Sequence, residues 1–246
     1  MRVEYAEISL QGGREDNQDR VSIAVSEDAA LMVVMDGMGG HAHGERAAEL
    51  GRKVLVENFW HTPQPLLDPL GFLHMTLGLA HEQIAALGAK LPIEQRPRAT
   101  CATCIVQENS VWWAHMGDSR IYLLRDNAVL QRTRDHSHVE LLLQEGLITE
   151  AQAQNHPMRN FVECCLGGDP ILPEMSIARR LVLQRDDLLL LCSDGFWSNL
   201  RDDDLIAGFR SGVPLPQVLQ ALAERAVKIG GAGSDNTTAA ALRFLE

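Results

Sequence analysis

Five aspartates stand where short apolar segments begin or end, and each lies beside glycine, serine or asparagine. They are Asp19 in REDNQD, Asp36 in MDGMGG, Asp118 in MGDSR, Asp194 in CSDGF and Asp235 in GSDN. Oxygen ligands without clustered cysteine or imidazole favour hard cations such as Mg2+ or Mn2+. Aspartate is also common in turns, so any one of them alone could simply close a turn. The recurrence of the same pattern at five segment ends favours a shared site.

The segment Val33–Gly40, VVMDGMGG, raises the chemical question most directly. An apolar run that ends in one carboxylate predicts a buried strand with a charge at its tip, where the chain must turn. The glycines that follow allow backbone atoms to come close to a bound group. From these residues alone, the carboxylate could hold a metal ion or face a phosphate, or the segment could be no more than a tight turn.

Electrostatics restricts what such a group of acids can do if the five segment ends converge. Two bare carboxylates about 4 Å apart repel each other by about 4 kcal/mol at an effective dielectric constant near 20. Four or five of them are tolerable only if cations lie between them or if they take up protons. Convergence would therefore predict a site for divalent cations.

The elements that must position these acids follow from the apolar periodicity. Alternating or continuous apolar runs predict strands over residues 2–10, 21–25, 31–35, 100–107, 111–116, 121–124, 129–132, 175–183, 188–192 and 237–244. Helical spacing predicts helices over residues 44–60, 65–87, 139–145, 202–209 and 216–229. Tight hairpins require antiparallel pairing, and the helices come in pairs rather than after every strand. We therefore expect an α+β layered sandwich, with residues 1–246 as a single domain and residues 146–169 as an irregular flap.

Composition excludes several classes of protein. A formal net charge of −11 argues against a nucleic-acid partner, because phosphate backbones require a basic face. The longest aliphatic run, Leu188–Leu191, is far shorter than the roughly 20 residues of a membrane span, and the first ten residues do not resemble a signal peptide. The five cysteines are odd in number and lie in apolar surroundings, as reduced thiols do. We expect no membrane segment and a cytoplasmic location.

Several motifs in sequence order give the chain a family resemblance. REDNQD, MDGMGGHAHGE, MGDSRIYLL, RDHS, LLLCSDGFWSNL and GSDNTTAAAL together resemble the metal-dependent Ser/Thr protein phosphatases of the PPM (type 2C) family in their bacterial form. The resemblance extends over essentially the whole chain. It implies a four-layer αββα sandwich that hydrolyses phosphoserine and phosphothreonine in phosphorylated proteins and opposes a Ser/Thr protein kinase. We also expect the chain to be a monomer.

The resemblance also implies a role for each candidate residue. Asp36 would bridge two Mn2+ or Mg2+ ions, and the Gly37 carbonyl would ligate one of them. The remaining ligands would be Asp194 and Asp235 for the first ion, Asp19 for the second, and Asp118 with Asp194 for a possible third ion. Arg14 would grip the substrate phosphate through its bidentate fork. The implied reaction is direct attack on phosphorus by a hydroxide that bridges the two ions, without a covalent intermediate.

The chain departs from the eukaryotic members of that family directly after the Asp-Gly pair. Those members have a histidine there, assigned as the general acid, whereas this chain has Met38. The acid is therefore open between a metal-bound water and His41, and Asn236 is a further candidate for a supporting role. Ser193 lacks the G-x-S-x-G context of a serine nucleophile.

Two other functions compete with that of a protein phosphatase. One is a phosphatase for a small phosphorylated metabolite. The other is an inactive family member that binds phosphoproteins as a regulatory module. The presence of all five carboxylates argues against the second, because degenerate members typically lose metal ligands.

Overall fold

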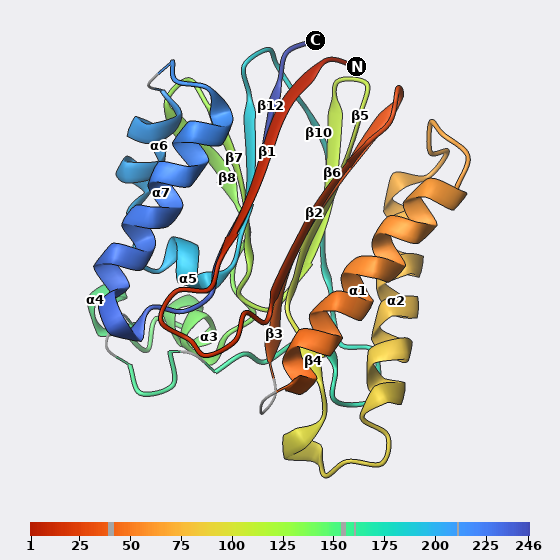
Figure 1. Ribbon diagram of the computed structural model, residues 1–246, viewed down its shortest axis with the longest axis vertical. Coiled ribbons are helices and arrows are strands. Elements are labelled where there is room, and N and C mark those ends of the chain that lie inside the picture. The colour runs from red at the N-terminus through yellow and green to blue at the C-terminus, as the bar shows by residue number, and fades with distance from the viewer. Residues whose placement is uncertain (39–41, 154–155, 160, 211) are drawn as a thin grey trace.

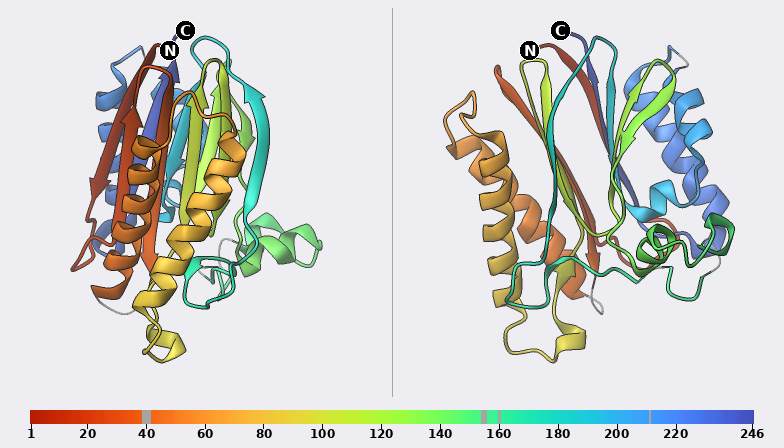
Figure 2. Two further views of the ribbon diagram at one scale, coloured as in Figure 1. Left: turned by 90° about the vertical axis from the view of Figure 1, so that its right-hand side faces the viewer. Right: turned by 180° about the vertical axis from the view of Figure 1, so that it is seen from behind.

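Two antiparallel sheets lie face to face at the centre of the computed structural model, and helices cover their outer faces (Figure 1). The structure describes residues 1–246 apart from 39–41, 154–155, 160 and 211 and the side chains of 42 and 179. Figure 2 shows the same four layers from the side and from behind. The predicted α+β sandwich of two sheets between helix layers is confirmed.

The first sheet has five strands in the order β1-β12-β11-β7-β8. Its strands are β1 (Val3–Leu10), β7 (Arg120–Arg125), β8 (Ala128–Arg132), β11 (Leu188–Cys192) and β12 (Thr237–Phe244). The predicted hairpin joins β7 to β8, with Asp126 and Asn127 at φ angles of 51° and 61°. Aspartate and asparagine tolerate this left-handed conformation better than most residues, so the turn follows from its sequence.

The second sheet has seven strands in the order β10-β6-β5-β3-β4-β9, and β2 pairs with the free side of β3. Its strands are β2 (Asp19–Val25), β3 (Ala29–Met38), β4 (Arg98–Ala99), β5 (Cys101–Gln107), β6 (Ser110–Met116), β9 (Leu166–Gly167) and β10 (Ser176–Val182). All of its strand pairs are antiparallel. As a result, strand ends that are distant in sequence meet at the same end of the sandwich.

Two groups of helices form the outer layers (Figure 1). The second sheet is covered by α1 (Ala42–His61) and α2 (Pro69–Leu87), and the first sheet by α5 (Asp194–Trp197), α6 (Asp202–Phe209) and α7 (Leu215–Gly230). The remaining helices are α3 (His138–Gln144), α4 (Glu150–Ala153), η1 (Ile93–Gln95) and η2 (Gly231–Gly233). Among the helices described here, none has the length and apolar character needed to cross a bilayer.

Three apolar layers hold the sandwich together. Each central strand contributes side chains to two of these layers, one on each face of its sheet. In β11, Leu190 packs toward α7, whereas Leu189 and Leu191 pack between the sheets. In β3, Val33 faces the α1 and α2 layer and Val34 faces the other sheet. A strand that is buried on both faces has no polar alternation, which explains its continuous apolar sequence.

The structure corrects three boundaries that the sequence predicted. The expectation of a turn directly after Asp36 is wrong, because β3 continues to Met38 and Gly37 pairs with Ala99 of β4. Helix α2 begins at Pro69 rather than at residue 65, because the Asp68 side chain accepts a hydrogen bond from the Gly71 backbone at 2.9 Å and caps the helix there. The segment 146–169 contains α4 and β9 and is therefore not wholly irregular.

Replacing Leu190 with alanine should lower the free energy of unfolding by about 2–5 kcal/mol, because the side chain is fully buried and its loss leaves a cavity. Urea unfolding at constant pH measures the change. Leu130→Ala in β8 is the control, since Leu130 is 54% exposed, and it should change the value by no more than about 0.5 kcal/mol. Equal effects of the two substitutions would contradict this assignment of the core.

Candidate metal centre

The five aspartates selected from the sequence gather at one end of the two sheets. The starts of β2 and β12 and the ends of β3, β6 and β11 all lie at this end (Figure 1). Asp19 opens β2, Asp36 lies near the end of β3, Asp118 follows β6, Asp194 follows β11 and Asp235 precedes β12. The antiparallel topology thus brings together carboxylates from across the whole chain.

Asp19 and Asp36 lie directly opposite each other in the register of β2 and β3. Opposite residues of an antiparallel pair point to the same face of the sheet, with Cβ atoms about 5 Å apart. The backbone of Asp36 is also fixed on its other side, because its N–H donates to the Thr100 hydroxyl at 3.2 Å and its carbonyl accepts from the Thr100 N–H at 2.9 Å. The main chain therefore holds this pair of carboxylates together.

Close approach of three backbone segments explains the glycine after Asp36. A Cβ atom at Gly37 would lie 2.2 Å from the Gly44 carbonyl oxygen and 2.8 Å from that of Gln18. The Gly37 N–H donates to the same Gln18 carbonyl at 3.2 Å. Any larger residue would push α1 or the segment before β2 away from the acids.

Burial and mutual repulsion raise the pKa of most of these carboxyl groups. Burial is the largest cause in each case, and neighbouring aspartates add to it. The pKa rises to about 7 for Asp19, about 8 for Asp118 and about 6 for Asp194, and that of Asp36 lies well above its usual range. The charged forms are therefore costly, and a compensating cation or a bound proton would relieve that cost.

Two buried carboxylate oxygens have no hydrogen-bond partner in the described part of the chain. They are Oδ1 of Asp19 and Oδ1 of Asp194. An unsatisfied buried acceptor costs about 1–3 kcal/mol, and more when it is charged. Carboxylate oxygens and a backbone carbonyl form the donor set that Mg2+ and Mn2+ prefer, so the orphaned oxygens fit such ions.

The carboxylate groups do not all point toward a common centre. Among the described residues, no three acidic, histidine or cysteine side chains are grouped in a way that would hold an ion as they stand. Asp235 is instead turned toward Arg14, whose Nε and Nη2 donate to its two oxygens at 2.8 and 2.6 Å. The Asp235 carboxylate raises the pKa of Arg14, as expected for a bidentate ion pair.

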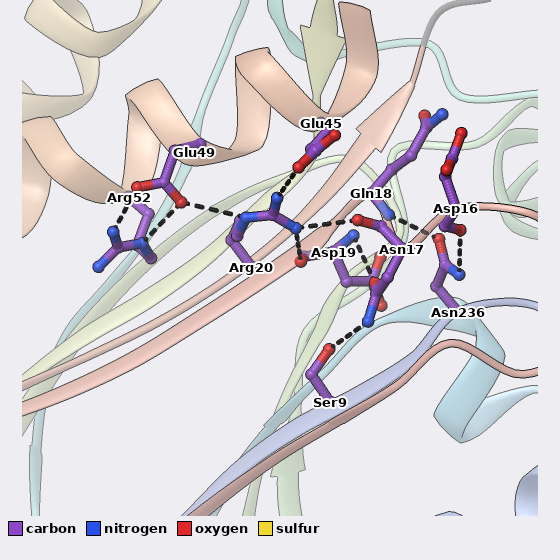
Figure 3. A network of polar contacts seen from close by, with 10 residues as sticks. All are labelled: Ser9, Asp16, Asn17, Gln18, Asp19, Arg20, Glu45, Glu49, Arg52 and Asn236. Atoms are coloured by element: carbon purple, nitrogen blue, oxygen red, sulfur yellow. Dashed lines mark hydrogen bonds and ion pairs between the residues drawn. The ribbon is translucent and has the colours of Figure 1, made fainter. Parts of the chain in front are cut away.

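Asn236 holds the loop before β2 against the start of β12, as Figure 3 shows. Its side-chain amide donates to the carbonyls of Gln11 and Asp16 at 2.8 and 2.9 Å, and its side-chain oxygen accepts from the Gln18 N–H at 2.9 Å. The side chain is thus fully engaged in supporting the loop that carries Arg14 and Asp19. His41, the other candidate for a supporting or acid role, lies outside the described residues.

Arg20 ties the same loop to helix α1 (Figure 3). It donates to the backbone carbonyls of Asn17 and Asp19 at 2.9 and 2.7 Å. On the other side it pairs with Glu45 and, at 3.1 Å, with Glu49. The start of β2 is therefore fixed between α1 and β12.

Ser193 is a supporting residue that the sequence did not predict. The serine was considered only as a nucleophile, but its buried hydroxyl donates to Oδ2 of Asp19 at 2.7 Å and accepts from the Thr238 N–H at 3.1 Å. It therefore orients one carboxylate and joins β11 to β12. Its position next to Asp194 at the end of a strand was a sequence signal for a supporting role. Its partner, Asp19, is too distant in the sequence to be identified from that signal.

The acids open into a cleft of about 1810 Å3 that reaches to the segment between β8 and β9. Arg14, Asp118, Asp194 and Asp235 line one part of the cleft. The far end of this segment is fixed to α2, because the Gly167 N–H donates to Nδ1 of His81 at 3.1 Å. The cleft therefore combines the group of acids with a large lining surface.

In EDTA, the free energy of unfolding should fall as the pH rises from about 6.5 to about 8.5. Carboxyls with a raised folded-state pKa bind protons on folding, and this stabilisation is lost as the pH rises through values of about 7 for Asp19 and about 8 for Asp118. Burial lowers the pKa of His115 to about 4 and also lowers that of His136, and both act in the opposite sense, with an effect that fades as the pH rises above the ordinary histidine value of 6.5. Urea unfolding over this pH range measures the slope.

Asp118→Asn should make this pH dependence shallower, because it removes one of the groups that titrate in the window. The same substitution at the exposed Asp203 should leave the slope unchanged. A free energy of unfolding that stays constant or rises with pH in EDTA would contradict the crowding described above.

The chain matches known phosphatases along most of its length. A family model for Protein phosphatase 2C matches residues 11–229. The chain is 31% identical over 227 residues to the serine/threonine protein phosphatase PstP of Mycobacterium tuberculosis, covering 92% of this chain but only 41% of that relative. It is also 31% identical over 237 residues to the protein phosphatase PhpP of Streptococcus pneumoniae, covering 95% of this chain and 94% of PhpP.

Solved structures agree with the sequence matches. The serine/threonine phosphatase of S. agalactiae has a TM-score of 0.91 and 26% identity, and the match covers 100% of both chains. The catalytic domain of PstP in complex with two manganese ions has a TM-score of 0.84 and 28% identity, with 99% of each chain covered. The match to the family model and the agreement in fold lead to one conclusion: this chain belongs to the protein phosphatase 2C family.

Proposed function

We propose that this protein is a metal-dependent protein phosphatase that hydrolyses phosphoserine and phosphothreonine. The observation that carries the proposal is the convergence of five aspartates at one end of the two sheets, where two buried carboxylate oxygens have no hydrogen-bond partner among the described residues. Membership of the protein phosphatase 2C family supports the same reaction.

In the proposed centre, Asp36 and the Gly37 carbonyl would hold the ions together with Asp19, Asp194 and Asp235. Asp118 would contribute to a third site with Asp194. The complex of PstP with two manganese ions supports a pair of Mn2+ or Mg2+ ions. When bound, such a pair would supply the chemistry of an activated water, with hydroxide available for attack on phosphorus at neutral pH.

Arg14 is the proposed phosphate-binding residue. Its side chain is 58% exposed and lines the cleft beside the acids, so it can reach both Asp235 and a ligand. On substrate binding, its planar fork would exchange the Asp235 carboxylate for two phosphoryl oxygens. Asp235 would then be free to turn toward a cation, which couples substrate binding to completion of the metal site.

The leaving alkoxide needs a proton, and two residues near the centre can be ruled out as its donor. Met38 carries no transferable proton, and Asn236 is engaged with three backbone groups. We therefore propose water in the cleft as the acid, with His41 as the alternative from outside the described residues. Either source is compatible with the same attack geometry.

The size of the cleft favours a protein substrate over a small metabolite. Its volume of about 1810 Å3 exceeds the roughly 300–1,000 Å3 typical of small-molecule pockets. The names of the relatives PstP and PhpP also describe protein phosphatases. We propose a phosphorylated protein as substrate, a Ser/Thr protein kinase as functional counterpart and a monomer as the working unit.

Hydrolysis of p-nitrophenyl phosphate should require Mn2+ or Mg2+ and should stop in EDTA. Asp194→Asn should lower kcat/KM by at least about 100-fold, because it removes a charged group from the centre. Asp203→Asn is the matched control, since Asp203 is an exposed aspartate on α6, and it should keep activity within about twofold. Activity that persists in EDTA would rule out the proposed mechanism.

Arg14→Ala should lower kcat/KM for p-nitrophenyl phosphate by about 10- to 100-fold, mainly through a higher KM. Hydrogen bonds to a charged group are worth about 1.5–3 kcal/mol, which sets this range. Arg14→Lys should restore only part of the loss, because an ammonium group lacks the bidentate fork. Steady-state kinetics with Mn2+ test both variants, and an unchanged KM in Arg14→Ala would refute the role.

A further inference from the structure

Two arginines beside the proposed centre have side chains that are not engaged by the described part of the chain. Arg132 and Arg134 line the same cleft as Asp118 and Asp194, and both side chains are exposed. Within the part of the chain that the structure describes, neither guanidinium has an ion pair or a hydrogen bond. The cleft arginines Arg14 and Arg120, in contrast, are paired with Asp235 and Asp135.

The residue between the two arginines is held by the neighbouring strand. Strand β8 lies at the edge of the first sheet (Figure 1) and ends at Arg132, directly before Thr133. Thr133 is buried, its hydroxyl accepts from the Ile121 N–H at 3.0 Å, and its own N–H donates to the Ile121 carbonyl at 3.0 Å. Thr133 is thus fixed against Ile121, and Arg132 and Arg134 on either side of it both line the cleft.

The backbone that carries these arginines is fastened to the group of acids. His115 donates from Nε2 to the Arg134 carbonyl at 2.7 Å, and burial keeps this imidazole neutral by lowering its pKa to about 4. The His136 N–H donates to the carbonyl of Gly117, the residue before Asp118, at 2.8 Å. The distance between the arginines and the acids is thus fixed from both sides of residue 135.

A stacked ion pair adds a third connection between this backbone and the acids. Asp135 accepts two hydrogen bonds of 2.8 Å from Arg120, whose guanidinium lies 3.2 Å over the Trp197 ring. The Trp197 indole in turn donates to the Asp118 carbonyl at 2.9 Å. Asp135 therefore pairs with Arg120, while the guanidinium groups of Arg132 and Arg134 stay available to a ligand.

The charges of the cleft are unevenly distributed. Its remaining acidic side chains, Glu140, Glu150 and Asp202, belong to α3, α4 and α6. The two unpaired arginines belong to the end of β8, in a chain whose net charge is −11. Two further arginines line the cleft: Arg159, in the segment between β8 and β9, and Arg201, which precedes α6 and pairs with Asp204. An anionic group entering the cleft would be attracted to the unpaired guanidinium groups at the end of β8, whereas the side chains of α3, α4 and α6 that line it are acidic.

We infer that Arg132 and Arg134 form a subsite for a second anionic group, a carboxylate or a phosphoryl group, on the phosphopeptide substrate. Two guanidinium forks suit either group, because each presents paired donors to paired oxygens. This inference rests on the proposed function, since it assumes that a phosphopeptide occupies the cleft. It names the substrate class as peptides with a negative charge near the phosphorylated serine or threonine.

The test compares phosphopeptides that differ at one flanking position. Each peptide carries one phosphoserine and has glutamine, glutamate or a non-hydrolysable phosphonate analogue of phosphoserine at successive positions on either side. Values of kcat/KM are measured with Mn2+ for the natural protein, for R132Q/R134Q and for R185Q. Each value is divided by that for p-nitrophenyl phosphate, which has no flanking group, so that changes at the centre itself cancel.

The natural protein should prefer an anionic residue over glutamine at one or more positions by about tenfold, the effect of two exposed charge pairs. R132Q/R134Q should lose this preference, and added salt should weaken it in the natural protein. R185Q should retain it, because Arg185 is 70% exposed in the turn between β10 and β11. Loss of preference for the phosphonate alone would assign the subsite to a phosphoryl group.

Three results would overturn the inference: no preference in the natural protein, an undiminished preference in R132Q/R134Q, or an equal loss in R185Q. Each leaves hydrolysis of p-nitrophenyl phosphate intact, so the proposed function would stand. Failure of the proposed function would show separately, as absence of metal-dependent hydrolysis of any substrate.

Discussion

Repulsion among buried carboxylates is the constraint on which the rest of this structure depends. Asp19 and Asp36 lie opposite each other on paired strands, and burial, with a further contribution from neighbouring acids, raises the pKa of both. At about 4 kcal/mol for a bare pair about 4 Å apart, such crowding would separate groups carried on loops alone. Three apolar layers and the ladders of two sheets supply the opposing rigidity, because the strands cannot move apart without exposing their core residues.

The polar groups around the acids offset only part of this cost. Ser193 satisfies one oxygen of Asp19, and Arg14 satisfies both oxygens of Asp235. One oxygen each of Asp19 and Asp194 stays without a partner in the described part of the chain. A centre that is stabilised completely by its own protein would have no affinity left for a ligand. The unsatisfied carboxylate oxygens thus suit the proposed centre to bind cations, and they lower the stability of the protein without cations.

Sequence periodicity predicted the α+β sandwich, because each strand and helix has its own apolar pattern. The gathering of the acids was expected from the recurrence of aspartate at segment ends and from the family resemblance. The predicted bounds of β12 and α6 match the structure, since each apolar pattern is buried as expected. The supports were not predictable in the same way. Asn236 bonds to the loop before β2 and Ser193 to Asp19 at the start of β2, both more than 170 positions away. Strand β3 extends past Asp36 only because the two-residue strand β4 lies beside it. Such pairings are set by tertiary contacts that no local pattern contains.

Residues 132–135, at the end of β8 and directly after it, have two different kinds of role. Thr133 is buried and Asp135 holds Arg120, so both contribute contacts to the fold. Arg132 and Arg134 alternate with them and contribute none within the described structure, although their backbone is tied to the acids through His115 and Gly117. Substitution at the two arginine positions should therefore alter the charge of the cleft at little cost in stability. The scaffold thus permits substrate preference to change at positions that leave the geometry of the proposed centre unaltered.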